Sequence, residues 1–166
     1  MKCPSCGREM RSTKKDYRYE EAGLKNVVLK DIAVHECKCG EIMPAIPHIH
    51  RLHQQISEDL VSKQSPLTGG EFRFLRKSMG MSAKELAQLL GVTTVTVSRW
   101  ENNKERVGAQ SDRLLRCLYV TRSKGWLSSK VAKTLENIMS GIVGRKSKAE
   151  PIFISPPSTA RERRVG

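Results

Sequence analysis

Residues 82–101 constrain the fold more than any other segment, because two short helices joined by a tight turn fit every position in it. Ser82 and Glu85 form the Ser-x-x-Glu capping box that opens a helix. Gly91 ends this first helix with a positive φ, which glycine adopts without steric cost. Ala87 supplies the small side chain required where the second helix crosses closest. An apolar face at helical spacing is formed by Leu86, Leu89 and Leu90.

The second helix of the pair returns apolar side chains to the core and turns others outward. Its core-facing residues are Val92, Val97 and Trp100. Its outward-facing residues are Thr93, Thr94, Val95, Ser98, Arg99 and Asn102. This spacing, with its Ser-Arg-Trp-Glu ending, resembles the helix-turn-helix of the Cro/XRE repressors over roughly residues 68–122. The resemblance implies a helix that enters the DNA major groove, whereas the alternative is an amphipathic hairpin with no ligand.

The residue types on the outward face suggest how DNA would be read. Arg99 is the best candidate for a bidentate contact with O6 and N7 of guanine. Val95 has no donor or acceptor, so we expect it to meet a thymine methyl group. Thr93 is the predicted N-cap, while Thr94 and Ser98 are expected to bond to a base or a phosphate. Candidate phosphate contacts, each with the alternative of a solvated surface charge, are Lys77, Lys84, Lys104 and Arg106.

The charge of the chain is strongly basic and unevenly distributed. Among 166 residues, Lys and Arg number 30 against 17 Asp and Glu, a net charge of +13 that favours a polyanionic partner. Basic and acidic side chains nearly balance in residues 1–65, so the excess lies in residues 66–125 and 126–166. We therefore expect a first domain with another task, a DNA-binding domain over residues 66–140 and a basic tail. With no apolar run near the roughly 20 residues of a membrane span and no signal-peptide pattern, we expect a cytoplasmic protein.

The first domain carries two close pairs of cysteines. Cys3 and Cys6 stand two residues apart before a glycine, whereas Cys37 and Cys39 have a single spacer residue. Clustered cysteines in a reducing compartment are more often metal ligands than disulfides, and four thiolates in two pairs suit one tetrahedral structural zinc ion. His35 is near enough to replace one thiolate, and a chain without metal is a further alternative.

Strand-like runs lie between the two cysteine pairs, at residues 17–19, 27–29 and 32–34. Gly23, Asn26 and Asp31 are expected to break them apart. A sheet this small buries little core alone, so bound zinc would supply the missing stability.

A helix is predicted from about Pro47 to Lys63, with an apolar stripe formed by Ile49, Leu52, Ile56 and Leu60. We place the following histidines on its polar face rather than on a metal: His48, His50 and His53. Residues 63–68 then break the helical pattern and serve as a linker or hinge.

Two further helices are predicted after the helix-turn-helix. The first buries Leu114, Leu115, Leu118 and Tyr119, with Cys117 as a small apolar residue. The second begins near Ser128, and its stripe either completes the core or forms a dimer face: Leu127, Val131, Leu135, Ile138 and Ile142. Residues 141–166 are basic and contain prolines, so we predict a disordered tail that adds salt-sensitive, nonspecific DNA affinity. The expected fold class is α+β: a small zinc-bound β-rich domain, an all-α five-helix Cro/XRE-like helix-turn-helix domain and the tail.

The order of these parts resembles the MqsA/YgiT-type antitoxins over about residues 1–125. The matching motifs are Met-Lys-Cys-Pro-x-Cys-Gly at the start, Cys-Gly-Glu at residues 39–41 and the Ser-Arg-Trp-Glu ending. The resemblance implies a zinc domain that contacts a toxin, and a homodimeric DNA-binding domain that represses the toxin–antitoxin operon at a palindromic site. The shortened second cysteine pair, Val95 and the C-terminal tail depart from the family pattern.

Two other functional classes fit the sequence less well, a regulator without a toxin and an enzyme. A zinc-containing transcriptional regulator without a toxin is the alternative, because the same architecture occurs there. An enzyme is not expected, since the sequence has no nucleophile–base constellation, no paired acids in a cleft-forming context and no phosphate loop. A zinc ion held by four cysteines has no open coordination position, which makes it structural.

Overall fold

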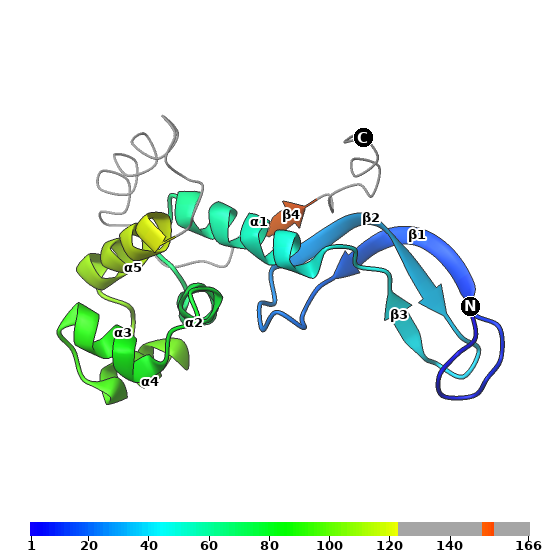
Figure 1. Cartoon of the computed structure of the whole chain (residues 1–166), viewed down its shortest axis with the longest axis horizontal. Helices are drawn as coiled ribbons and strands as arrows, with labels where there is room; N and C mark the ends of the chain where they lie inside the picture. The colour runs from blue at the N-terminus through cyan, green and yellow to red at the C-terminus, as the bar shows by residue number, and fades with distance from the viewer. Residues whose placement is uncertain (123–150, 155–166) are drawn as a thin grey trace, which may run out of the picture.

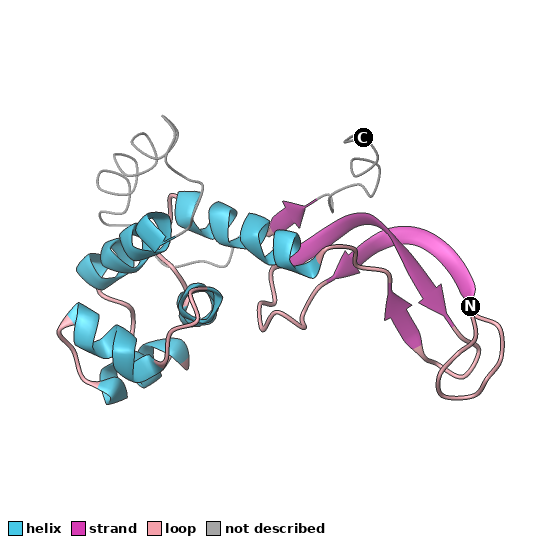
Figure 2. Ribbon diagram, viewed as in Figure 1, coloured by secondary structure: helices cyan, strands magenta, loops and turns pink. Residues whose placement is uncertain are grey.

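A sheet and a helical domain lie at opposite ends of an elongated molecule, with one long helix between them (Figure 1). The computed structural model describes residues 1–122 and 151–154. Strands and helices are segregated along the molecule, as Figure 2 shows. The elements in chain order are β1 (Arg11–Arg18), β2 (Val27–Glu36), β3 (Ile42–Pro44), α1 (Ile49–Ser62), α2 (Gly69–Ser78), α3 (Ala83–Leu90), α4 (Thr94–Glu101), α5 (Ala109–Arg122) and β4 (Ile152–Ile154). The predicted α+β class is confirmed, with α1 among the five described helices.

Strand β2 is the centre of the sheet. It pairs antiparallel with β1 and β3, and parallel with β4. The prediction that Asp31 breaks the strand is wrong, because β2 runs through it as a β-bulge. Asp31 has a φ of 50°, and the register slips opposite it, between Lys15 and Tyr17. The extra residue moves the buried positions from Val27 and Leu29 to Ile32 and Val34, so one apolar face is kept on both sides of the bulge.

One apolar core runs from the sheet to the helix-turn-helix. Leu29 of β2, Ile56 of α1, Phe72 of α2 and Leu115 of α5 all belong to it and are fully buried. The sheet therefore buries its apolar face against helices rather than standing alone. The α1 stripe forms as predicted except at Ile49, which is 46% exposed.

The segment predicted as a linker or hinge is held by a buried charge network. Arg116 and Asp112, both fully buried, form an ion pair on α5 with a 2.6 Å N–O distance. The Arg116 guanidinium also donates hydrogen bonds to three backbone carbonyl oxygens, that of Val61 in α1 and those of Lys63 and Ser65 in the segment. Asp112 accepts a hydrogen bond from the backbone N–H of Leu67 at 2.6 Å. The backbone from residue 61 to 67 is thus fixed to α5.

A second ion pair holds the same segment from α2. Lys63 donates to Glu71 at 2.8 Å, and both side chains are buried. Glu71 also accepts from the backbone N–H of Thr68, which completes a capping box at the start of α2. Asn26, next to the first residue of β2, donates to Glu71 as well, at 3.2 Å. The sheet, the linker and the helical domain therefore meet at one carboxylate.

The C-terminal part of the chain differs from the prediction at one point. Residues 152–154 form β4 inside the segment expected to be disordered. The basic, proline-containing composition concealed an apolar triplet whose partner strand lies far away in the sequence. The helix predicted near Ser128 and the rest of the tail lie outside the described residues.

Candidate metal centre and DNA-recognition helix

The four predicted cysteines converge at the far end of the sheet. Their sulfur atoms all lie within 4.8 Å of one another. The closest approaches join the two pairs crosswise, with Cys3 and Cys39 at 3.6 Å and Cys6 and Cys37 at 3.4 Å. A tetrahedral zinc ion with Zn–S bonds of about 2.3 Å sets its sulfurs about 3.8 Å apart, so this donor set fits the ion. His35 is not part of the cluster.

Two glycine turns bring the thiols together. Gly7 has a φ of 72° and donates its backbone N–H to the carbonyl of Cys3 at 2.9 Å. Gly40 has a φ of 96° and donates in the same way to Cys37 at 3.0 Å. The single-spacer pair therefore closes by the same device as the two-spacer pair. Ser5 joins the two turns by donating to the carboxylate of Glu41 at 2.7 Å.

The thiols of Cys6 and Cys39 have pKa values shifted in opposite directions. The backbone of Arg8 and the thiol of Cys37 hydrogen-bond to Cys6 and lower its pKa to about 6. Although the Glu41 backbone acts in the opposite direction, hydrogen bonds with Cys37 and the other thiols raise the pKa of Cys39 to about 12. Because thiolates are the zinc ligands, metal binding must displace the protons that remain on the cluster.

The helix-turn-helix forms with the predicted local geometry. Ser82 and Glu85 make both hydrogen bonds of the capping box at the start of α3. Gly91 ends α3 with a φ of 67°. Ala87 is buried in the main apolar core. The Thr93 hydroxyl accepts from the backbone N–H of Thr96 and caps α4.

Helix α4 has one buried face and one open face. Val97 and Trp100 are buried, and the Trp100 ring meets Phe72 of α2 edge to face at 5.7 Å. All six residues predicted to face outward are exposed: Thr93, Thr94, Val95, Ser98, Arg99 and Asn102. The candidate phosphate contacts are also exposed: Lys77, Lys84, Lys104 and Arg106.

A buried ion pair fixes the end of α4, and sequence reasoning missed it. Arg76 of α2 makes a bidentate contact with Glu101, at 2.5 and 2.9 Å, and donates to the carbonyl of Met81 at 2.6 Å. Gly69 donates to the side chain of Asn103 at 2.9 Å. The glycine is required because a Cβ at this position would lie 2.1 Å from a backbone oxygen of α4. The orientation of α4 is therefore set from α2 at two points.

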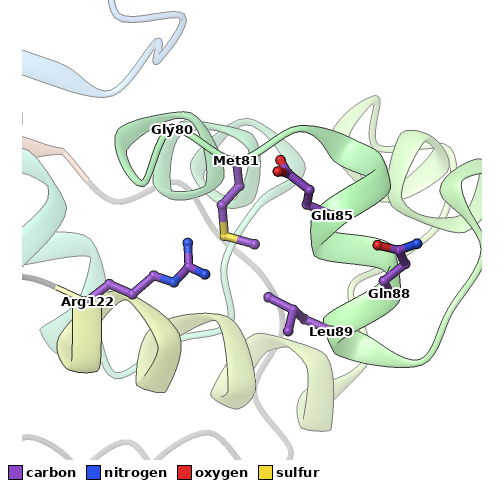
Figure 3. Close-up of a pocket in the computed structure, with 6 residues that line it drawn as sticks. All are labelled: Gly80, Met81, Glu85, Gln88, Leu89 and Arg122. Carbon is purple, nitrogen blue, oxygen red and sulfur yellow. The ribbon is translucent and has the colours of Figure 1, made fainter.

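The predicted apolar positions Leu89 and Leu114 are wrong, since their exposed fractions are 52% and 49%. At 3.6 residues per turn, Leu89 lies roughly 110° from the centre of the buried stripe of α3. It lines a groove of about 260 Å³ with Gly80, Met81, Glu85, Gln88 and Arg122. Figure 3 shows Met81 and Leu89 on one side of this groove and Arg122 on the other.

The histidines of α1 do not form a metal site among the described residues. His53 hydrogen-bonds to the Tyr19 hydroxyl at 2.9 Å and packs edge to face on Phe74 at 5.6 Å. Burial, together with the charge of His50, lowers the pKa of His53. His53 therefore connects Tyr19, which directly follows β1, to Phe74 of α2.

Fold and site together define a two-part protein, in which a sheet with a four-cysteine centre is fused to a helix-turn-helix domain. Within residues 1–122 and 151–154, no helix combines the length and apolar character needed to cross a membrane. The chain belongs to the MqsA antitoxin family, because the family described as the antitoxin component of bacterial toxin-antitoxin system, MqsA, matches residues 1–122. This confirms the predicted family, and an antitoxin is not an enzyme. Searches of curated proteins and of solved structures gave no match.

Proposed function

We propose that the chain neutralises a toxin through its sheet domain and represses its own operon through α4. In this proposal the sheet domain holds one structural zinc ion, and a homodimer binds a palindromic operator. The observation that carries the DNA-binding half is the open face of α4, whose six predicted residues are all exposed while two buried anchors hold the helix. Membership of an antitoxin family carries the other half, since it implies a toxin partner.

The proposed zinc site rests on the donor set. Four sulfurs within 4.8 Å of one another match the size of a tetrahedral site, and thiolates favour zinc over harder cations. A zinc ion bound to all four sulfurs would hold the two glycine turns together. It would have no open coordination position for a substrate. Metal content tests this: Cys39→Ser should lose bound zinc, whereas Cys117→Ser, on α5 and outside the cluster, should keep it. Full zinc content in Cys39→Ser would remove Cys39 from the ligand set.

Base reading is assigned to the exposed residues of α4. Arg99, in the last turn, has the planar donors that match guanine, and Val95, 60% exposed, suits a thymine methyl group. Thr93, Thr94, Ser98 and Asn102 supply shorter polar contacts to bases or phosphates. Lys84 and Lys104 flank the helix and are assigned to phosphates, which position the protein without specifying sequence.

The Arg99 assignment is tested by titrating fluorescent operator DNA and random DNA in parallel. Arg99→Ala should weaken operator binding by about 1–3 kcal/mol and leave binding to random DNA nearly unchanged. The matched control is Lys104→Ala, which should weaken binding to operator DNA and to random DNA and should reduce the salt dependence of the affinity. Equal losses on both DNAs for Arg99→Ala would end its base-reading role.

The toxin assignment is tested by co-purification with the product of the adjacent gene. A small basic ribonuclease-like protein encoded there should co-elute with the full chain. Failure of any neighbouring product to bind would favour a regulator without a toxin.

The proposed dimer is tested by light scattering of the full chain. Two-fold symmetry of the dimer predicts operator half-sites about one DNA turn apart.

A further inference from the structure

Strand β4 comes from outside the part of the chain that the family shares. The family match ends at residue 122, whereas β4 covers Ile152–Ile154. It pairs in parallel with the first residues of β2, Val27 to Leu29. The backbone N–H of Ile152 donates to the carbonyl of Asn26 at 2.7 Å. A segment outside the matched residues therefore pairs with the edge of a sheet whose other three strands lie within them.

The contact of β4 depends on one deeply buried side chain. Ile154 is 5% exposed and joins the main core, whereas Ile152 is partly buried and Phe153 is 59% exposed. The ammonium group of Lys30 lies over the exposed Phe153 ring, 4.6 Å from its centroid. An open groove of about 230 Å³ runs beside β4, against α1. A three-residue strand with one anchor belongs to the least stable elements of a fold, which open without global unfolding.

When β4 leaves, the backbone groups of residues 27–29 on that side of β2 lose their partners. An exposed strand edge with a vacant apolar site beside it is a template for an added strand. We propose that this edge is a docking site for an extended strand of the toxin, and that β4 is a built-in competitor for it. This inference rests on the proposed toxin-binding function.

The geometry defines the strand that fits. It runs parallel to β2 and places a branched apolar side chain where Ile154 now lies, between Leu29 and α1. The residue before it faces outward beside Lys30, as Phe153 does, so an aromatic or acidic side chain suits that position. A polar residue at the Ile154 position would leave the core site empty and bind weakly.

The first experiment uses the full-length chain and a fluorescent peptide with the sequence of residues 150–156. Ile154→Asp places a charge in the core position of Ile154 and should release β4 from β2. In wild type, β4 docked more than ~90% of the time competes with the peptide, so the peptide should bind Ile154→Asp at least about tenfold more tightly than wild type. The matched control is Phe153→Ser, which changes the exposed neighbour and should bind the peptide like wild type. Zinc content and circular dichroism show that each variant is folded. Equal peptide binding by Ile154→Asp and wild type would overturn the proposal.

A second variant avoids any change to the core. Val28 and Phe153 are register partners, so Val28→Cys with Phe153→Cys can lock β4 onto β2 by a disulfide. The locked form should bind the toxin at least about tenfold more weakly than the same protein after reduction, because the competitor cannot leave. Equal toxin binding by the two forms would overturn the competition. If no form binds the toxin, the proposed function fails, and the peptide result still decides whether the edge accepts a strand.

Discussion

Replacing Arg116 by methionine removes the charge at the centre of the buried network while keeping much of its apolar stem. Asp112, fully buried, then loses its ion-pair partner, and the carbonyls of Val61, Lys63 and Ser65 lose their donor. Breaking one side of a buried pair costs about 3–5 kcal/mol, because the other charge stays buried and uncompensated. Domains of this size have total stabilities of roughly 5–15 kcal/mol, so the loss is a large fraction of the whole.

Urea unfolding of the zinc-loaded protein, followed by circular dichroism, measures this loss as a change in midpoint at constant slope. The control is Arg122→Met, an exposed arginine on the same helix, which should change stability by less than about 0.5 kcal/mol. A loss below about 1 kcal/mol in Arg116→Met would refute the reasoning, because it would mean that water reaches the network.

The double variant Arg116→Met with Asp112→Leu separates the ion pair from its surroundings. Removing both charges abolishes the uncompensated carboxylate, so the double variant should be more stable than Arg116→Met alone. The recovery is incomplete, because the backbone N–H of Leu67 loses its acceptor at a cost of about 1–3 kcal/mol. Strict additivity of the two single substitutions would contradict a direct interaction between the two side chains.

Three further predictions concern other parts of the molecule. Gly69→Ala should lower the free energy of unfolding in urea by about 1–3 kcal/mol, because its Cβ would lie 2.1 Å from a backbone oxygen of α4. The control is Gly108→Ala, which has open space around the new Cβ and should leave the free energy of unfolding almost unchanged. The pKa of His53 is lowered in the folded state, so its contribution to stability is present above the unfolded-state pKa of about 6.5 and is lost as pH falls through the folded-state pKa. On acidification the thermal unfolding midpoint should therefore drop less in His53→Gln than in wild type. Equal drops in the two proteins would count against this role of His53. Chelating the metal should remove hydrogen-exchange protection from the backbone amide of Gly40 but not from that of Val34, because the buried residues around the cysteines and the main core are separate clusters. Loss of protection at both amides would show that the sheet depends on the metal.

Features that depend on neighbours in the chain were predictable. The capping box of α3, the left-handed Gly91 and the Thr93 cap each follow from residues within a few positions of one another. The metal centre was also predictable, because two cysteine pairs carry a chemical signal that does not depend on the path of the chain between them.

Features that depend on distant contacts were not predictable. Composition marked residues 63–68 as a hinge, since the partners that fix them, Arg116 and Asp112, lie about fifty residues away and look like surface charges in a basic helix. The local sequence at Asp31 predicts a strand break, because only the pairing of β2 with β1 shows that Asp31 lies in a bulge. Leu89 was assigned to the core, because periodicity does not reveal how wide a stripe the neighbouring helices cover.

The clamped linker limits how the two proposed binding functions influence each other. A rotation of the sheet about residues 63–68 must break the buried ion-pair contacts of Arg116 or Glu71, which hold the linker on the helical domain. The sheet and α4 therefore act as one body, with a continuous core between them. Under the proposed function, a toxin bound to the sheet would be held at a fixed distance and angle from DNA bound by α4, and it would favour or block operator binding by its position rather than by a hinge motion.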